Sequence, residues 1–557
     1  MFLLLGFGLI NLEVIQGRIN RDLSKKNCIR LISQPGSRGK ILDREGCVIV
    51  DNKISYNLMI IPQELNGLDK ALTSLSGILG VSVTDLKKKY KNSYIAPAVP
   101  VTIAENIGTK KAIAIEQLKQ DIPAVTIQLE PKRSYPYGKL ACHLIGYLSE
   151  IDRWRLTKLE DYGYKTKDIV GFGGVEEKFD YYLRQEEGGL SVEVDHKGKL
   201  VRVLGFESPH NGKDIQLTLN LKIQKIVEDN LEDKRGSVVI MDPGTGEIIA
   251  MASSPGFNPS DFVEKSSSVA GFFSDSSASL VNRAISGAYP AGSIFKVIVA
   301  TGGLEAKKIN MSTSFFCQGS IQIGRGEFDC WSTHHDQNLL AAIAHSCNVF
   351  FYKTGLLLGA QAIHDYACKF GLSRITGFDL PYEVSGFIPS PLWRKINKFK
   401  SWYDGDTANL SIGQGDVLVT PIQMVRMMAV FANKGYLVTP YITKAVDGKD
   451  ISAYQRRASR VPFKPSTINY VSQGLRGVVL EPKGTGNVLS SLSVSIAGKT
   501  GTAQAPPGQP HAWFVGFFPF EEPKYVICTF LEHGGPGYVS CVLTKRIIEA
   551  MINEGLI

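Results

Sequence analysis

The sequence lacks several features that would assign it quickly to a class of protein. Its 557 residues contain no long run of like charges, and 62 Lys and Arg against 53 Asp and Glu leave a net charge of only +9. A nucleic-acid-binding protein concentrates positive charge in one patch, so we expect no nucleic-acid partner. No repeat of roughly 20–50 residues is present, which argues against a solenoid or a propeller. Cysteine is scarce and odd in number, at nine, which excludes a disulfide scaffold.

Long hydrophobic runs are also missing. The apolar stretch within residues 1–15 is interrupted by Asn11 and Glu13, whereas a membrane-spanning helix needs about 20 apolar residues. No small-residue cleavage site follows cleanly, as a secretory signal would require. We therefore expect residues 1–20 to form a partial membrane anchor. A buried first helix is the alternative.

The rest of the chain divides near residue 209, where a Pro-His-Asn-Gly cluster predicts a turn. Residues 21–208 mix short strand and helical patterns and are expected to form an elongated mixed α/β domain. Residues 209–557 open with a helical stripe and a hairpin over 236–252. Helical patterns follow from about 291 to 370, then strand patterns at 494–498, 513–518 and 525–531, and a closing helix. Strands at both ends with helices between them predict an α+β fold whose central antiparallel sheet unites distant segments.

Three short motifs carry the chemistry of the second domain. The first is Ser293-Ile294-Phe295-Lys296, at the start of an apolar helical pattern. Residues i and i+3 of a helix share a face, so the Ser293 hydroxyl and the Lys296 amine can meet. Serine is a weak nucleophile that needs a neighbouring base, and a lysine can be that base only when burial or a nearby like charge keeps it neutral.

The second and third motifs are Ser346-Cys347-Asn348 and Lys499-Thr500-Gly501-Thr502. The hydroxyl and amide of the second motif can relay a proton and hold a peptide carbonyl. Lys499 supplies a cation for a carboxylate and the like charge that would depress the pKa of Lys296. Gly501 would let a substrate backbone approach closely, and an exposed strand edge there can take an extended peptide.

Each motif also occurs a second time, at Ser37–Lys40, Ser55–Asn57 and Lys353–Gly355. Any one motif alone is therefore weak. Only the set containing Ser293 combines a helix start, a loop and a strand end, which favours a joint catalytic role.

That set resembles the penicillin-binding protein and serine β-lactamase superfamily. The segments around Ser293, at 411–415 (SIGQG) and around Lys499 resemble class B penicillin-binding proteins, and most of all the elongation-specific penicillin-binding protein 2. Arg38-Gly39 and the Gly-Gly-Val-Glu at 173–176 resemble the N-terminal pedestal of that family. The resemblance implies a non-catalytic, dimerisation-type pedestal in 21–208 and a penicillin-binding, β-lactamase-like transpeptidase domain in 209–557.

The resemblance implies a serine-type D-Ala-D-Ala transpeptidase or carboxypeptidase that crosslinks peptidoglycan stem peptides during cell elongation, through an acyl-enzyme on Ser293. β-Lactams would acylate the same serine. By resemblance Lys296 is the base, Ser346 and Asn348 shuttle protons and hold substrate, and Lys499 and Thr500 bind the terminal carboxylate. Gly501 lies at the substrate strand, and the backbone N–H groups of Ser293 and Thr502 form the oxyanion hole. Acyl transfer of this kind requires no cofactor.

The family also implies a place in the cell and partners. The chain is expected in the inner membrane with a single-pass anchor and its catalytic domain in the periplasm. Expected partners are peptidoglycan stem peptides, a membrane glycan polymerase of the SEDS type and rod-complex scaffold proteins. Three alternatives remain at this point: a division-specific class B enzyme, a β-lactamase or β-lactam sensor with the same motifs, and a non-enzymatic scaffold.

The cysteines contain one possible metal site. Cys317, Cys330 and Cys347 lie in the same segment as His334-His335, and thiolate and imidazole ligands suit tetrahedral Zn²⁺. Buried structural thiols or a disulfide are the alternatives. Some Gram-negative relatives resemble this pattern, with a zinc ligand at the middle residue of the second motif, here Cys347. His334 fits that pattern better than its neighbour, so the candidate structural Zn²⁺ ligands are Cys317, Cys330, His334 and Cys347.

Overall fold

The computed structural model describes residues 29–557 except 95, 96, 98, 187 and 195–199, together with the single positions 6 and 16. The anchor expected in residues 1–20 otherwise lies outside the described residues. In the part of the chain that is described, no helix is both long enough and apolar enough to cross a membrane.

The chain forms two compact units that interleave along the sequence. Unit 1 comprises 1–40, 50–136 and 181–214, and unit 2 comprises 41–49, 137–180 and 215–557. Two segments that the sequence analysis places in the first domain, 41–49 and 137–180, thus pack with the second. The turn near residue 209 marks only one of several crossings between the units, so no single cut in the sequence separates them.

Unit 1 combines a helix-covered sheet with a separate ribbon. β3 (Val48–Ile60) pairs antiparallel with both β4 (Val101–Ala104) and β5 (Val125–Ser134). Three helices bury Leu72, Leu86 and Ile115 against this sheet; they are α3 (Leu68–Leu79), α4 (Val83–Ser93) and α5 (Gly108–Leu118). The ribbon consists of β1 (Ile29–Gln34), β8 (Gly188–Val194) and β9 (Leu200–Glu207).

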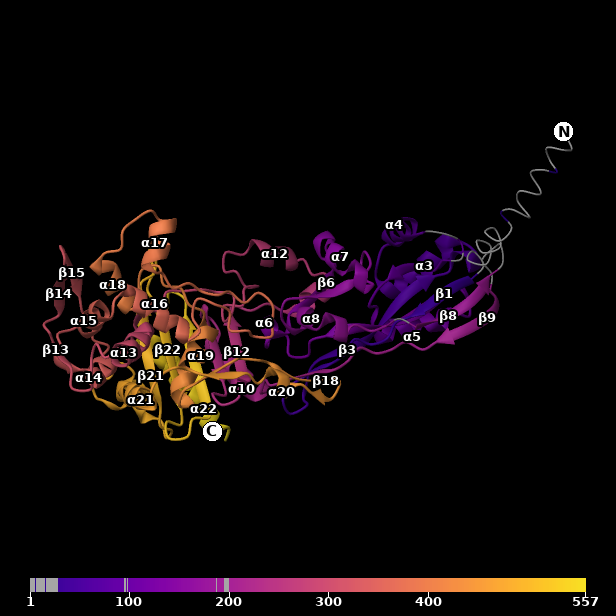
Figure 1. Ribbon diagram of the computed structural model, residues 1–557. Helices are drawn as coiled ribbons and strands as arrows, with labels where there is room; N and C mark the ends of the chain where they lie inside the picture. Colours follow the sequence, from indigo (N-terminus) through magenta and orange to yellow (C-terminus); the bar gives the residue numbers. More distant parts are fainter. Residues whose placement is uncertain are drawn as a thin grey trace. The chain divides into compact units, whose positions relative to one another are not determined.

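A five-stranded antiparallel sheet forms the centre of unit 2, with the strand order β12-β11-β23-β22-β21. The strands are β11 (Gly236–Met241), β12 (Ile248–Ser254), β21 (Ala497–Ala503), β22 (His511–Phe518) and β23 (Tyr525–Leu531). β11 pairs directly with β23, although nearly 300 residues separate them in the chain. The sheet thus unites the two ends of the domain, as the alternation of strands and helices predicts, and leaves β21 at an edge (Figure 1).

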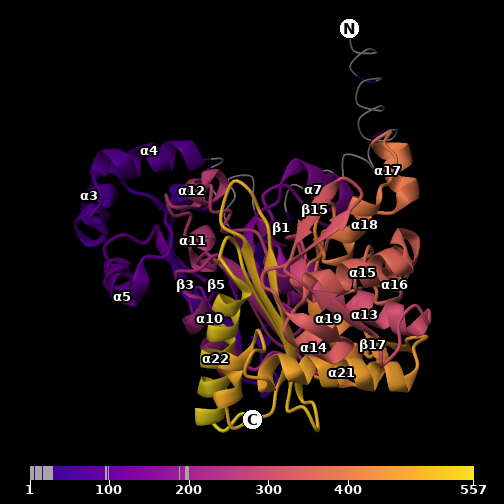
Figure 2. The ribbon, with the colours of Figure 1, turned by 90° about the vertical axis from the view of Figure 1, so that its left-hand side faces the viewer.

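Helices cover both faces of this sheet. α10 (Leu221–Leu231) and α22 (Gly537–Asn553) pack on one face through a cluster that includes Val227, Phe514 and Ile547, and Figure 2 shows them side by side. α19 (Pro421–Ala432) contacts β11, β22 and β23. It is buried along its whole length, and all of its residues except Gln423 and Arg426 are apolar.

A helical subdomain lies between β12 and β21 in the chain. Its helices are α13 (Lys296–Glu305), α14 (Leu339–Ala344), α15 (Asn348–Leu358), α16 (Ala360–Lys369), α17 (Pro391–Asn397), α18 (Asp404–Ser411) and α21 (Pro465–Leu480). α13 packs against α15, α16 and α21. The expectation of a purely helical segment over 291–370 is wrong in part, because two small hairpins interrupt it: β13 (Ser314–Cys317) with β16 (His335–Asn338), and β14 (Ser320–Ile323) with β15 (Gly326–Asp329).

Shorter elements complete unit 2. Residues 137–180 contribute α6 (Cys142–Ile145), β6 (Tyr147–Glu150), α7 (Arg153–Leu159), β7 (Ile169–Phe172) and α8 (Gly174–Lys178). β10 (Ile215–Leu217) pairs with β2 (Ile41–Leu42) and with β18 (Thr443–Val446). Others are α11 (Pro259–Val263), α12 (Val269–Ser274), β17 (Tyr436–Val438), β19 (Lys449–Asp450), α20 (Ser452–Gln455) and β20 (Ala458–Arg460).

Candidate active site

Ser293 lies on a single 3₁₀ turn, Gly292–Phe295, that leads directly into α13. Gly292 has a left-handed φ of +57° and donates its N–H to the carbonyl oxygen of Gly413 at 2.9 Å. A Cβ at position 292 would lie 2.7 Å from the carbonyl oxygen of Thr502. The serine turn is thus held between the 413 loop and strand β21, with the Ser293 side chain only half-buried.

Lys296 joins the first motif to the second. Its side chain is fully buried, and its Nζ donates to the Ser346 carbonyl oxygen at 2.7 Å, to Ser346 Oγ at 3.2 Å and to Asn348 Oδ1 at 2.6 Å. Burial lowers the pKa of Lys296 to about 8, against the opposing effect of nearby thiol groups. The amine is therefore neutral far more often near neutral pH than an exposed lysine would be.

The second motif occupies the tight connection between α14 and α15. Ser346 adopts a left-handed φ of +55°, which is uncommon for a residue with a side chain. Cys347 precedes the first turn of α15 and Asn348 begins it. This backbone turns the Ser346 and Asn348 oxygens toward Lys296, as the sequence analysis requires of a proton relay.

Lys499 lies within β21 and is also fully buried. Its Nζ donates to the Thr500 carbonyl oxygen at 3.2 Å. Burial, and after it the positive charge of Lys296, lowers the pKa of Lys499 well below its ordinary value. The expectation that the like charge of Lys499 depresses the pKa of Lys296 is wrong in emphasis, because burial is the main cause for both amines.

The third motif lies inside β21 rather than after a strand at 494–498. The strand begins only at Ala497, and residues 494–496 precede it. Gly501 faces the protein's own atoms: a Cβ there would lie 3.0 Å from both Ile294 Cγ1 and Trp513 Cβ. The expectation that Gly501 admits a substrate backbone is therefore incomplete, since the missing side chain also lets β21 pack against the serine turn.

Several residues that were not foreseen from the sequence contact the third motif. Thr485 Oγ1 lies 2.7 Å from Thr500 Oγ1, and Gln414 Nε2 reaches the Thr502 carbonyl oxygen at 3.5 Å. Thr502 Oγ1 accepts the N–H of Gly537 at 2.9 Å. Thr485 stands between two glycines and Gln414 likewise, so a polar residue in a Gly-X-Gly loop was the signal available in the sequence.

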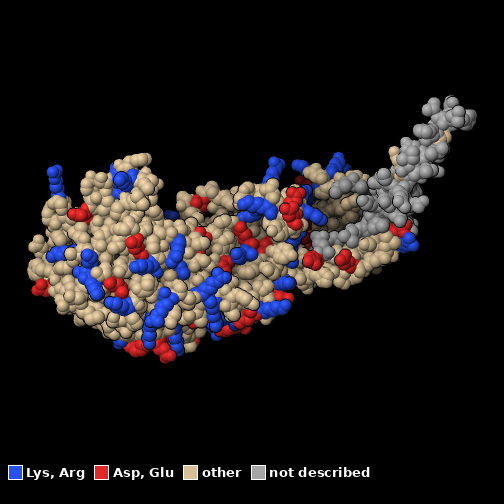
Figure 3. Space-filling view, in the orientation of Figure 1, with Lys and Arg blue, Asp and Glu red and all other residues tan. Residues whose placement is uncertain are grey.

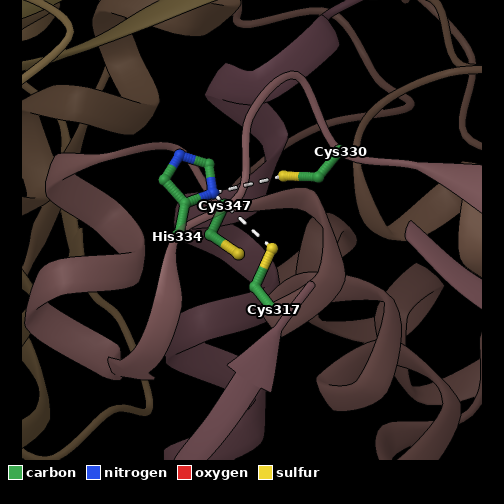
Figure 4. Close-up of side chains that lie close together, drawn as sticks. All are labelled: Cys317, Cys330, His334 and Cys347. Atoms are coloured by element: carbon green, nitrogen blue, oxygen red, sulfur yellow. Dashed lines mark hydrogen bonds between the residues drawn. The ribbon is translucent and has the colours of Figure 1, made fainter. Parts of the chain in front are cut away.

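The three cysteines and His334 converge beside the second motif (Figure 4). Their ligand atoms all lie within 4.8 Å of one another, with His334 Nδ1 3.4 Å from Cys330 Sγ and 3.7 Å from Cys317 Sγ. The Asn348 N–H donates to Cys330 Sγ at 3.2 Å. Hydrogen bonds from the Cys347 thiol and from backbone N–H groups lower the pKa of Cys330, which favours a thiolate there. Three thiols and one imidazole form a donor set that fits tetrahedral Zn²⁺.

Comparison with known proteins assigns the family. The model of the penicillin-binding protein transpeptidase domain matches residues 236–552, and that of the penicillin-binding protein dimerisation domain matches residues 33–217. The chain belongs to the penicillin-binding protein transpeptidase family. Its three motifs fall within the matched transpeptidase domain, and residues 33–217 correspond to the dimerisation domain.

Individual penicillin-binding proteins are similar over almost the whole chain. The peptidoglycan D,D-transpeptidase MrdA of Escherichia coli K12 is 30% identical, over 97% of this chain and 90% of the relative. The penicillin-binding protein PBP2 in the complex of PBP2 and MreC from Helicobacter pylori superposes with a TM-score of 0.85 at 26% identity, covering 95% of this chain and 99% of that one. A structure titled as a peptidoglycan synthase complex that coordinates polymerization and crosslinking superposes with a TM-score of 0.76 at 28% identity, covering 99% and 96%. The predictions of family, fold class and transpeptidase activity are confirmed.

Proposed function

We propose that this penicillin-binding protein crosslinks peptidoglycan by acylating Ser293 with the D-Ala-D-Ala end of a donor stem peptide. The observation that carries the proposal is the set of three short bonds from the buried amine of Lys296 to the second motif. They hold an amine that is neutral far more often than an exposed lysine against the hydroxyl–amide pair of the second motif. The family and the name of the E. coli relative support peptidoglycan as the substrate.

In the acylation step, Ser293 Oγ attacks the carbonyl carbon of the penultimate D-Ala while Lys296 Nζ accepts the hydroxyl proton. The backbone N–H groups of Ser293 and Thr502 would stabilise the resulting oxyanion. When the C–N bond breaks, the leaving D-Ala amine takes a proton that Ser346 Oγ relays from Lys296. An ester on Ser293 and free D-Ala result.

In the second step, the amine of an acceptor stem attacks this ester and loses its proton to Lys296, and Ser293 Oγ is reprotonated as it leaves. Asn348 would hold the donor peptide, and Lys499 with Thr500 would bind its terminal carboxylate. The approach of a carboxylate would favour the charged form of Lys499, which burial otherwise opposes. The free edge of β21 can pair with the extended donor peptide.

Labelling with a fluorescent penicillin tests this function. The wild type should form a stable adduct and Ser293→Ala should form none, whereas Ser37→Ala, which alters the other S-x-x-K sequence, should label like the wild type. An adduct that survives Ser293→Ala would sink the proposal. Rapid loss of the label from the wild type would instead identify a β-lactamase.

We place this activity in cell elongation, with a membrane-anchored chain and its catalytic domain in the periplasm. The titles of the matched structures, which name PBP2 with MreC and a peptidoglycan synthase complex, support rod-complex scaffold proteins and a glycan polymerase of the SEDS type as partners. Depletion should then produce round cells. Filaments with blocked septa would indicate the division-specific branch.

We also propose a structural Zn²⁺ on Cys317, Cys330, His334 and Cys347. Bound there, the ion would fix the backbone on both sides of Cys347 and so orient Ser346 and Asn348. Protein purified without chelator should contain about one equivalent of zinc, and Cys330→Ser should lose it. Cys368→Ser is the matched control, because Cys368 is a free, partly buried thiol outside the cluster. Less than about a tenth of an equivalent in the wild type would refute the site.

A further inference from the structure

Helix α17 and the loop that follows it expose four large apolar side chains. Leu392, Ile396, Phe399 and Tyr403 are 63%, 59%, 90% and 67% exposed. Leu392 and Ile396 are four residues apart, so they share one face of the helix. Soluble proteins rarely leave such a group of apolar side chains in solvent without a role in binding.

The same segment is strongly basic. Residues 391–403 contain Arg394, Lys395, Lys398 and Lys400 and no acidic residue. Arg394 pairs with Asp406 and Lys398 with Asp416. Among the described residues, Lys395 and Lys400 have no ion-pair partner, and both are exposed. Figure 3 shows Lys and Arg side chains at the upper edge of the molecule, where Figure 1 places α17.

Contacts of two neighbouring tryptophans hold this segment in place. The Trp393 ring packs on Phe387 with centroids 4.5 Å apart, and Trp402 Nε1 donates to Thr407 Oγ1 at 2.8 Å. Phe399 is held at a left-handed φ of +51°, which costs of order 1–3 kcal/mol for a bulky residue. The partly buried rings of Trp393 and Trp402 are thus fixed by contacts, whereas the four apolar side chains remain exposed, as in a preformed binding surface. We call Leu392, Lys395, Ile396, Phe399, Lys400 and Tyr403 the α17 platform.

Contacts connect the α17 platform to the active site. Lys398 Nζ binds both carboxylate oxygens of Asp416, at 2.6 and 2.7 Å. Two residues earlier, Gln414 reaches the Thr502 carbonyl oxygen of the third motif. Gly413 accepts the N–H of Gly292, the residue before Ser293. Residues 413–416 thus link the segment that carries the platform to the serine turn and to the third motif.

We propose that the α17 platform binds the glycan–peptide strand that carries a reacting stem, at a distance from the D-Ala end. This inference rests on the proposed function. Peptidoglycan offers sugar rings with apolar faces and stem peptides with free carboxylates. Exposed aromatic and aliphatic side chains pack on the former, and lysines with apolar stems and charged heads pair with the latter. The platform has both in one segment and carries no acidic side chain of its own to repel the strand.

The platform makes the enzyme prefer a polymer over a short peptide, and this is testable. Ile396→Ser/Phe399→Ser removes apolar contact, and Lys395→Glu/Lys400→Glu reverses charge. The matched controls are Tyr454→Ser and Lys449→Glu, an exposed aromatic residue and an exposed lysine of the same unit. The full-length protein is assayed for cosedimentation with purified sacculi, for crosslinking of glycan strands, and for acylation by a fluorescent penicillin.

Both platform variants should lose about tenfold in sacculus affinity and in strand crosslinking, equivalent to about 1.4 kcal/mol of binding, and the controls should lose nothing. Penicillin acylation should stay within about twofold of wild type, because none of the substituted residues belongs to the three motifs proposed to carry out acylation. Unchanged sacculus binding would overturn the inference, as would a parallel loss of penicillin acylation. Loss of binding only to vesicles of anionic lipid would overturn it in favour of a membrane contact. Failure of the wild type itself to react with penicillin would refute the proposed function instead.

Discussion

The protonation state of Lys296 makes a quantitative prediction. Its pKa of about 8 leaves about a tenth of the amine neutral at pH 7, whereas the ordinary value of 10.5 would leave only about 0.03% neutral. Burial thus increases the supply of neutral base about 300-fold. Because only the neutral amine can accept the Ser293 proton, acylation must accelerate as pH rises and level off once pH exceeds the pKa.

The assay is the second-order rate constant for acylation by a fluorescent penicillin between pH 6 and pH 9.5, corrected for spontaneous hydrolysis of the drug. We expect the constant to rise about tenfold from pH 6 to pH 7 and to reach a plateau above about pH 8.5. Lys296→Arg keeps the positive charge but cannot act as a base, so it should fall by about 10²–10⁴-fold at every pH.

Three results would refute this reasoning. A rate independent of pH would remove Lys296 as the titrating base. A rate that still rises about tenfold per pH unit up to pH 9.5, with no plateau, would show that burial does not lower its pKa. A rate that falls as pH rises would require the protonated amine in the acylation step, which the three acceptor oxygens around Nζ would then serve to hold. The wild type and Lys296→Arg distinguish these cases without a structure of the complex.

Two further predictions concern stability and the serine turn. Burial raises the pKa of Glu228 from near 4.5 to about 7, so its protonated form stabilises the fold fully below pH 4.5 and this contribution is lost as pH rises through 7. At pH 8, Glu228→Gln should therefore have a free energy of unfolding up to about 3 kcal/mol above that of the wild type, and a higher melting temperature. At pH 4.5 the two should melt alike, and the same difference in melting temperature at both pH values would contradict this. Gly413→Ala would place a Cβ 2.3 Å from the Gly292 carbonyl oxygen, whereas Gly415→Ala shares the left-handed backbone but meets no neighbour within 4 Å. The first should slow penicillin acylation at least about tenfold and the second much less, and equal effects would show that backbone strain, not contact, governs the loop.

The three motifs were predictable because each is a short pattern whose chemistry is visible locally. Their contexts were also visible: an apolar run after Ser293, a loop at Ser346 and a strand at Lys499. The ends of the strands were not predictable, because hydrogen bonding across the sheet decides where β21 begins. The Thr485–Thr500 contact could not be predicted for a related reason, since a loop has no periodic pattern that indicates which residues it contacts.

The interleaving of the two units along the chain could not be predicted either, because it also depends on contacts between distant segments. Segments 41–49 and 137–180 look like the rest of the N-terminal sequence, yet they pack with unit 2. Ile41 and Leu42 form a two-residue strand whose parallel partner, β10, begins at Ile215. Composition and turn signals describe a segment's neighbours in the chain, whereas membership of a core depends on contacts that are distant in sequence. Such membership requires the structure.

The second motif shows why the direction of side chains matters more than their spacing. Ser346 and Asn348 direct oxygen atoms at Lys296, while Cys347 between them directs its sulfur at the cluster with Cys330. The same turn therefore contributes to two sites, the contacts of Lys296 and the sulfur cluster, and each site uses different side chains of that turn. A change in the sulfur cluster can reach Lys296 through the charges of Cys330 and Cys347, which raise its pKa, or by moving that backbone. A movement of the backbone should weaken the three bonds to Nζ together rather than one at a time. Spacing alone placed a thiol between two relay groups, and the left-handed turn at Ser346 gives each of the three residues a separate direction.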